Sequence, residues 1–147
     1  MKTFPFIILL TLIFCSSTGA QIPDSLKYKS LQPKDFQLRY QKEDKAILID
    51  VREFFEFRTS RLKGAVNIPS SGNLEPSADT IQKDCSLFLY CTSGFRSKRV
   101  AKYFYDEGFY GLYSLEGGIT AWKKDGLPVE KKRLRRHDKR HTEHLVP

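Results

Sequence analysis

The chain has 147 residues, of which 40% are hydrophobic and 29% are charged, and its formal net charge is +8 at pH 7. This length has room for one domain with a single core, which excludes a second domain of ordinary size. The composition is ordinary for a soluble globular protein.

The first 20 residues have the pattern of a secretory signal peptide. Lys2 precedes an apolar stretch over residues 4–14, and small residues follow at 16–20, so we place the cleavage after Ala20. Eleven apolar residues fall short of the roughly 20 that span a bilayer, which disfavours an uncleaved anchor. Lipoprotein processing before Cys15 is disfavoured by the bulky Phe14. We therefore expect an exported protein, periplasmic or secreted.

Strand-like and helix-like segments alternate after residue 20. We predict strands at 28–31, 46–51, 64–68, 86–90 and 112–115, helices at 33–40, 54–60, 97–107 and 118–125, and a loop at 70–84 with helical turns near 78–83. The unbroken apolar run 46–51 suits a strand that is buried on both faces. The alternation predicts βαβ units around a parallel sheet, whose sites lie at the carboxyl ends of the strands. Asp50, Cys91 and Glu116 occupy such ends.

Cys91 opens the segment Cys-Thr-Ser-Gly-Phe-Arg-Ser at residues 91–97, between a strand-like and a helix-like run. Backbone N–H groups in a glycine-containing loop can surround an anion, and a helix N-terminus adds positive potential. We expect these groups, together with the charges of Arg96, Lys98 and Arg99, to lower the pKa of the thiol and to favour the reactive thiolate. The alternative is a buried structural cysteine.

Cys85 and Cys91 are the two cysteines that follow the leader. If residues 85–91 are extended, their α-carbons lie roughly 20 Å apart, whereas a disulfide needs less than about 7 Å. We therefore expect Cys85 to be structural and Cys91 to remain an unpaired, accessible thiol.

Residues 130–147 form a basic tail with seven Lys or Arg residues and three acids. Such a charge excess predicts a solvated, disordered segment, which leaves a domain over residues 21–129. We expect the tail to contact an anionic surface, such as lipid headgroups or an acidic partner, and export argues against nucleic acid as its target. His137, His141 and His144 could bind a metal if the tail were helical, but a solvated tail is favoured, and we expect no metal and no cofactor.

Four stretches together resemble the rhodanese-like domain, in the order and at the separations of that family. They are Ile49-Asp50-Val51-Arg52-Glu53, Leu62-Lys63-Gly64-Ala65-Val66-Asn67-Ile68-Pro69, Tyr90-Cys91-Thr92-Ser93-Gly94-Phe95-Arg96-Ser97 and Leu115-Glu116-Gly117-Gly118-Ile119-Thr120-Ala121-Trp122. The resemblance covers about residues 27–128. One departure is Ser60-Arg61-Leu62, where the family often has Gly-His-Ile.

The resemblance implies an α/β fold, a five-stranded parallel sheet flanked by helices on both faces. It also implies a sulfurtransferase that moves sulfane sulfur from thiosulfate or a similar donor to a thiol or cyanide through a persulfide on Cys91. Asp50 and Arg52 match residues that support the site. The loop that would bind substrate comprises Thr92, Ser93, Gly94, Phe95, Arg96 and Ser97. A protein that accepts sulfur is a further possible partner, and we expect the enzyme to act as a monomer.

Three alternatives stay open at this point. Cysteine phosphatases and the related arsenate reductases place five residues between cysteine and arginine, whereas four separate Cys91 from Arg96, and we argue that the shorter loop suits a sulfur atom better than phosphate. A non-catalytic rhodanese-like binding module is the second alternative. The third concerns Asp50 and Arg52, which could face the substrate or form a purely structural pair.

Overall fold

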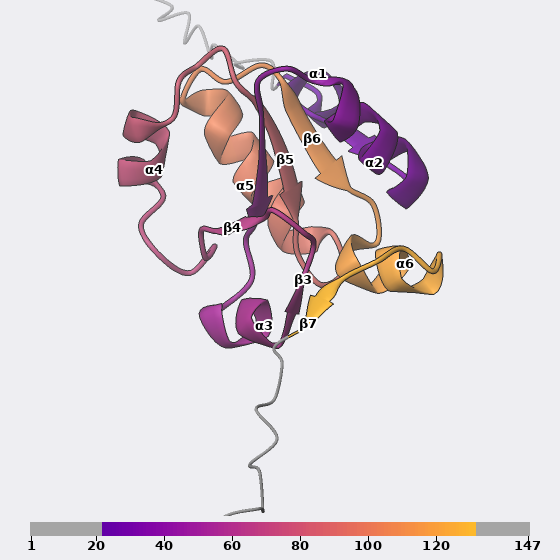
Figure 1. The fold of residues 1–147 in the computed structure, drawn as a ribbon. Helices are drawn as coiled ribbons and strands as arrows, with labels where there is room; N and C mark the ends of the chain where they lie inside the picture. The colour runs from indigo at the N-terminus through magenta and orange to yellow at the C-terminus, as the bar shows by residue number, and fades with distance from the viewer. Residues whose placement is uncertain (1–21, 132–147) are drawn as a thin grey trace, which may run out of the picture.

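The computed structural model describes residues 22–131. The predicted signal peptide, the alternative lipoprotein site at Cys15 and most of the basic tail lie outside these residues. The described part is a five-stranded sheet with the order β1-β6-β5-β2-β4, in which all neighbouring strands are parallel. Figure 1 shows this sheet between layers of helices. The predicted fold class is confirmed.

The main sheet contains β1 (Lys29–Leu31), β2 (Ala46–Asp50), β4 (Val66–Asn67), β5 (Ser86–Tyr90) and β6 (Leu112–Leu115). A separate antiparallel pair contains β3 (Ser60–Arg61) and β7 (Glu130–Lys131). The helices are α1 (Asp24–Lys27), α2 (Pro33–Lys42), α3 (Phe54–Thr59), α4 (Glu75–Thr80), α5 (Phe95–Asp106) and α6 (Gly118–Lys124). Within residues 22–131, none of these helices is long and apolar enough to cross a membrane.

The sheet is buried on both faces, which explains its continuous apolar strands. Along β5, Leu87 and Leu89 point to one face, where they pack with residues of α4 and α5. Phe88 and Tyr90 point to the other face, where they pack with residues of α2 and α6. The side-chain period of two in an extended strand thus divides one apolar run between two core clusters. Cys91 continues the alternation and belongs to the first cluster.

Two predicted helix boundaries differ from the structure. Helix α5 begins at Phe95 rather than at residue 97, because Gly94 adopts a φ of +95° and the chain turns directly into the helix. Helix α4 covers 75–80 rather than 78–83. Its start is fixed by the side chain of Asn73, whose Oδ1 accepts a hydrogen bond from the Glu75 N–H, and by Pro76 in the first turn.

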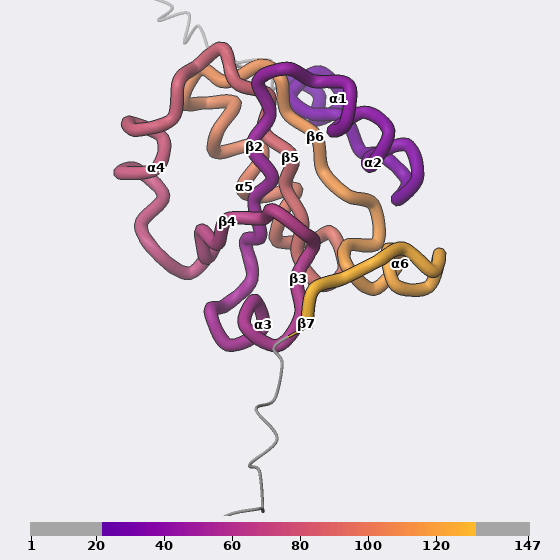
Figure 2. The backbone as a smooth tube through the Cα atoms, in the orientation of Figure 1, coloured from indigo at the N-terminus to yellow at the C-terminus, as the bar shows by residue number. Residues whose placement is uncertain are grey.

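The β3–β7 pair was not predicted from the sequence. Residue 60 belongs to β3 rather than to helix α3, and residues 130 and 131, which the sequence analysis assigned to the tail, form β7. Ser60 pairs with Lys131 and Arg61 with Glu130, and an ion pair of 3.2 Å joins the side chains of Arg61 and Glu130. Figure 2 shows the chain leaving β2, turning through α3 and passing along β3 beside β7. This small sheet therefore closes the end of the molecule that follows β2.

Candidate active site

Cys91 follows β5 directly, at the carboxyl end of the sheet, as predicted. Its Sγ lies 3.1 Å from the backbone nitrogen of Gly94, which donates a hydrogen bond to the sulfur. Cys85 and Cys91 are both free, so the expected absence of a disulfide between them is confirmed. The expectation of an accessible thiol is wrong, because Cys91 is only 1% exposed. Its side chain points to the same face of the sheet as Leu87 and Leu89, the face covered by α5.

The backbone of this loop is oriented by the start of helix α6. The Ile119 N–H donates to the carbonyl of Cys91 at 2.8 Å, and the Thr120 N–H donates to the carbonyl of Thr92 at 3.2 Å. Gly118, with a φ of +59°, allows this approach, because a Cβ there would overlap the Cys91 carbonyl oxygen. With two carbonyl groups held toward α6, the N–H groups that follow are free to turn toward the sulfur.

The pKa of the Cys91 thiol is lowered by the backbone around it. Burial is the largest single influence and acts to raise the pKa. Hydrogen bonds from the backbone N–H groups of Ser97, Ser93 and Gly94, helped by the Ser97 hydroxyl, together outweigh it. The net result favours the thiolate, which is the nucleophilic form.

Two of the three positive charges expected near the thiol are paired with acids. Arg96 forms an ion pair with Glu56 at 2.9 Å, and Lys98 forms one with Glu116 at 2.8 Å. The groups that lower the pKa of the thiol most are the backbone N–H groups of Ser97, Ser93 and Gly94, and Arg96 also interacts with the charge on Cys91. Arg99 is exposed and has no acid within ion-pair distance among residues 22–131.

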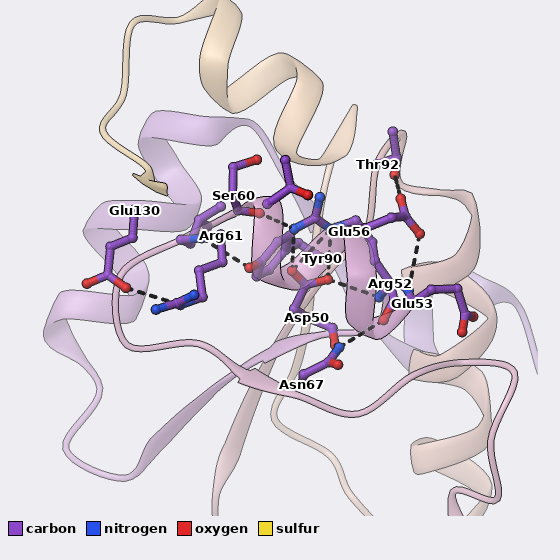
Figure 3. A network of polar contacts seen from close by, with 12 residues as sticks. Asp50, Arg52, Glu53, Glu56, Ser60, Arg61, Asn67, Tyr90, Thr92 and Glu130 are labelled. Atoms are coloured by element: carbon purple, nitrogen blue, oxygen red, sulfur yellow. Dashed lines mark hydrogen bonds and ion pairs between the residues drawn. The ribbon is translucent and has the colours of Figure 1, made fainter. Parts of the chain in front are cut away.

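Glu56 is the site residue that the sequence analysis missed. Its carboxylate accepts hydrogen bonds from both terminal nitrogens of Arg96, at 2.9 and 3.1 Å, and from the Thr92 hydroxyl at 2.8 Å. It also accepts one from the Glu53 N–H, in a capping box at the start of α3. Figure 3 shows Glu56 between Glu53 and Thr92.

The pKa of Glu56 reports the strength of these contacts. The hydrogen bond from Arg96 lowers it most, burial acts in the opposite direction, and Thr92 and Glu53 lower it further, to about 2. An acid in the first turn of the helix after β2, at the sheet edge where Cys91 lies, is the signal that could have identified it from the sequence.

Asp50 and Arg52 form a buried structural pair. Arg52 Nε and Nη2 donate to the Asp50 carboxylate at 2.9 and 2.6 Å, and Nη2 also donates to the Ser60 carbonyl at 2.6 Å. The two residues are 0% and 4% exposed. Asn67 donates to the carbonyls of both residues, and Figure 3 shows the contacts among Asp50, Arg52 and Asn67. The pair therefore fixes the backbone after β2, from which Glu56 reaches the loop.

The other predicted loop residues lie in different environments. Ser93 and Phe95 are exposed, and Phe95 is 70% exposed. Ser97 is fully buried; its hydroxyl donates to the Gly94 carbonyl at 3.0 Å and lies 2.9 Å from the Ser114 hydroxyl. Within residues 22–131, no group of three or more His, Cys, Asp or Glu side chains could hold a metal ion.

Comparison with known proteins bears on the family and the fold of the chain. Residues 32–125 match the family described as the rhodanese-like domain. A Synechocystis protein is 36% identical over 102 residues, covering 69% of this chain and 56% of that protein. Thiosulfate sulfurtransferase GlpE of Actinobacillus succinogenes is 32% identical over 87 residues, covering 59% of this chain and 78% of its own length.

Other relatives are longer proteins, so this chain matches only part of them. The chain covers 27% of the tRNA uridine(34) hydroxylase of Hamiltonella defensa, at 34% identity. Among solved structures, a rhodanese-related protein of Thermoplasma volcanium aligns with a TM-score of 0.59 and 27% identity, covering 70% of this chain and 98% of that one. The chain belongs to the rhodanese-like domain family.

Proposed function

We propose that this chain is a sulfurtransferase that moves sulfane sulfur from thiosulfate or a similar donor to a thiol or cyanide through a persulfide on Cys91. The observation that carries the proposal is the unpaired Cys91, whose Sγ accepts a hydrogen bond from the Gly94 N–H and whose pKa is lowered by the loop. A ring of N–H groups around sulfur can stabilise the charge of a persulfide as it stabilises a thiolate.

The reaction has two half-steps. In the first, the Cys91 thiolate attacks the outer sulfur of thiosulfate, a new S–S bond forms, and the old S–S bond breaks with its electron pair leaving on sulfite. In the second, an acceptor nucleophile attacks the outer sulfur of the persulfide. The bond between this sulfur and Cys91 Sγ breaks, and its electron pair returns to Sγ. Covalent catalysis of this kind gives ping-pong kinetics. The low pKa of Cys91 supplies the nucleophile without a histidine base, and residues 22–131 contain no histidine.

The burial of Cys91 restricts what can react. A residue that is 1% exposed admits a donor whose reacting end is a single sulfur atom more readily than one with a bulky reacting centre. Four residues between Cys91 and Arg96 and the engagement of Arg96 by Glu56 argue against a phosphate pocket. The same burial is the observation that favours the second candidate, a non-catalytic module that binds partners through its loop.

Mass spectrometry after incubation with thiosulfate tests the proposal. We expect an added mass of ~32 Da, one sulfur atom, on the wild type. Cys91→Ser should lose both this mass and the production of thiocyanate from cyanide, whereas Cys85→Ser should keep both. A folded wild type that gains no sulfur from any sulfane donor would point to the binding module, and hydrolysis of an aryl phosphate would point to a phosphatase.

We also propose that the domain works after export, on the strength of the leader pattern in residues 1–20. Expression of the full chain in a bacterial host, followed by N-terminal sequencing of the periplasmic fraction, tests this. A mature N-terminus at Gln21 supports the proposal, and recovery of the uncleaved chain from the cytoplasm alone contradicts it.

A further inference from the structure

A hollow lies along α5, the helix that follows the Cys91 loop. It has a volume of about 190 Å³ and lies between α5 and the segment that joins β4 to α4. Two guanidinium groups, two hydroxyl groups and two apolar side chains line it, from Arg96, Arg99, Ser70, Tyr103, Leu74 and Val100. We call it the Arg99 pocket. Its lining combines cationic and neutral hydrogen-bond donors, which is the chemistry of a site for a small anionic group.

The positive charge of this pocket comes from Arg99. Arg96 is already satisfied by the carboxylate of Glu56, with two hydrogen bonds. Arg99 lies three residues further along α5, on the same side of the helix, and no acid among residues 22–131 lies within ion-pair distance of it. The pocket therefore contains one guanidinium, that of Arg99, which forms no ion pair with an acid among residues 22–131.

The two ends of the pocket differ in charge. The pKa of Tyr103 is raised, first by burial and then by the negative charges of Glu107, Glu75 and Asp79. These acids disfavour an anion at the tyrosine end. An anionic group would therefore lie at the Arg99 end, which is the end nearer the start of α5 and the loop.

Arg96 joins the Arg99 pocket to the Cys91 loop. Its side chain lines the pocket, and its Nη2 donates a hydrogen bond of 2.9 Å to the hydroxyl of Thr92, the residue after Cys91. The pKa of Arg96 is raised first by its hydrogen bond with Glu56, against the effect of burial, and further by the charge on Cys91. Arg99 follows Arg96 by about one turn of α5, so the pocket extends from the edge of the Cys91 loop along this helix.

We propose that the Arg99 pocket binds the carboxylate of a small thiol that accepts sulfur from Cys91; this inference rests on the proposed function. The acceptor thiolate attacks the outer sulfur of the persulfide, the bond from that sulfur to Cys91 Sγ breaks, and its electron pair returns to Sγ. The acceptor leaves as a persulfide, so no oxidant or reductant is consumed. Arg99 holds the carboxylate and orients the thiolate, which raises its effective concentration at the reacting sulfur.

Matched acceptors test this proposal, with the persulfide form generated by thiosulfate. The acceptors are 3-mercaptopropionate, which has a carboxylate, 2-mercaptoethanol, which has none, and cyanide. For Arg99→Gln we expect KM for 3-mercaptopropionate to rise roughly tenfold or more, since hydrogen bonds to charged groups contribute that much. The KM for 2-mercaptoethanol should rise much less, because this thiol offers no carboxylate to Arg99.

Arg58→Gln is the control, because Arg58 is exposed, lies over the Phe54 ring and is outside the pocket. It removes the same charge, so a general electrostatic effect would appear in both variants. Equal changes for the charged and the neutral thiol in Arg99→Gln would overturn the inference and leave the proposed function standing. A wild type that transfers no sulfur to cyanide or to either thiol would overturn both.

Discussion

Glu56 and Arg96 join two parts of the sheet edge that are 40 residues apart in the chain. Arg96 Nη1 lies 2.9 Å from Glu56 Oε2, and Nη2 lies 3.1 Å from Oε1. The same carboxylate accepts the Thr92 hydroxyl, which also accepts a hydrogen bond from Arg96 at 2.9 Å. Thr92 and Arg96 lie before and after residues 93–95 of the loop. Glu56 therefore binds the loop on both sides of this segment.

Glu56→Gln should destabilise the protein in a pH-dependent way. The folded state lowers the pKa of Glu56 from 4.5 to about 2, which corresponds to up to about 3 kcal/mol at neutral pH. For a lowered acid pKa, this stability is fully present above pH 4.5 and is lost as the pH falls through about 2. Urea unfolding should show the difference between wild type and variant shrinking by about 2 kcal/mol between pH 7 and pH 3.

Asp125→Asn is the matched control for Glu56→Gln. Asp125 is exposed and has no ion-pair partner among residues 22–131, so its removal should change stability by less than about 0.5 kcal/mol. If Glu56→Gln gave the same small change at pH 7, the loop would not depend on Glu56.

Gly118→Ala should disrupt the loop through a steric contact. Its φ is +59°, and an added Cβ would overlap the Cys91 carbonyl and Thr92. Gly126→Ala separates the cost of a positive φ from the cost of a steric overlap. Gly126 has a φ of +73°, but an added Cβ there would meet no atom within 4 Å. We expect thermal or urea unfolding to show a loss of about 1–2 kcal/mol for Gly126→Ala, from backbone strain alone, and of about 3 kcal/mol or more for Gly118→Ala. Equal losses would mean that α6 does not constrain the loop.

The alkylation rate of Cys91 should depend on pH and on reagent size. With its pKa lowered by the loop, the thiol should reach half of its maximal rate below the ordinary value of 9.0. In a Cys85→Ser background, the reaction rate of each reagent with the folded protein is divided by its rate with the urea-unfolded chain. This ratio should be higher for iodoacetamide than for a bulky maleimide, because Cys91 is 1% exposed. A midpoint at or above 9.0 would contradict the assigned role of the backbone N–H groups.

The segments that form the main strands and the position of Cys91 at the end of one of them could be predicted, because each depends on local patterns. The apolar run 46–51 marks a strand buried on both faces, and Gly94 marks the turn from β5 into α5. The alternation of strands and helices predicted a parallel sheet, and the resemblance to a family added its five strands and the helices on both faces. The lowered pKa of Cys91 was also predicted, and the backbone N–H groups that the sequence analysis named are the main groups that lower it. The acids that pair with Arg96 and Lys98 were not predicted.

What the sequence did not reveal depends on contacts between distant segments. Glu56 meets Arg96 across 40 residues, and Glu116 meets Lys98 across 18, and neither pair has a local pattern. Burial of Cys91 likewise results from packing with residues of β2, β5 and α5 in one core cluster. The strand β7 consists of two residues at the start of a strongly charged segment, where charge alone predicts solvation rather than pairing.

The basic segment after β7 should be separable from the folded domain, and the boundary is set by the β3–β7 pair. Removal of residues 132–147 keeps the pairing of Arg61 with Glu130 and should leave the melting temperature and thiosulfate turnover unchanged. Removal of residues 130–147 deletes β7 and the 3.2 Å ion pair with Arg61, and should lower the free energy of unfolding by about 1 kcal/mol.

Both deletions remove the positive charges of 132–140, so both should weaken binding to anionic lipid vesicles at low salt by the same amount. Vesicle binding by the full chain that does not change with salt would contradict electrostatic tethering, and equal melting temperatures for the two deletions would place the end of the domain at 129.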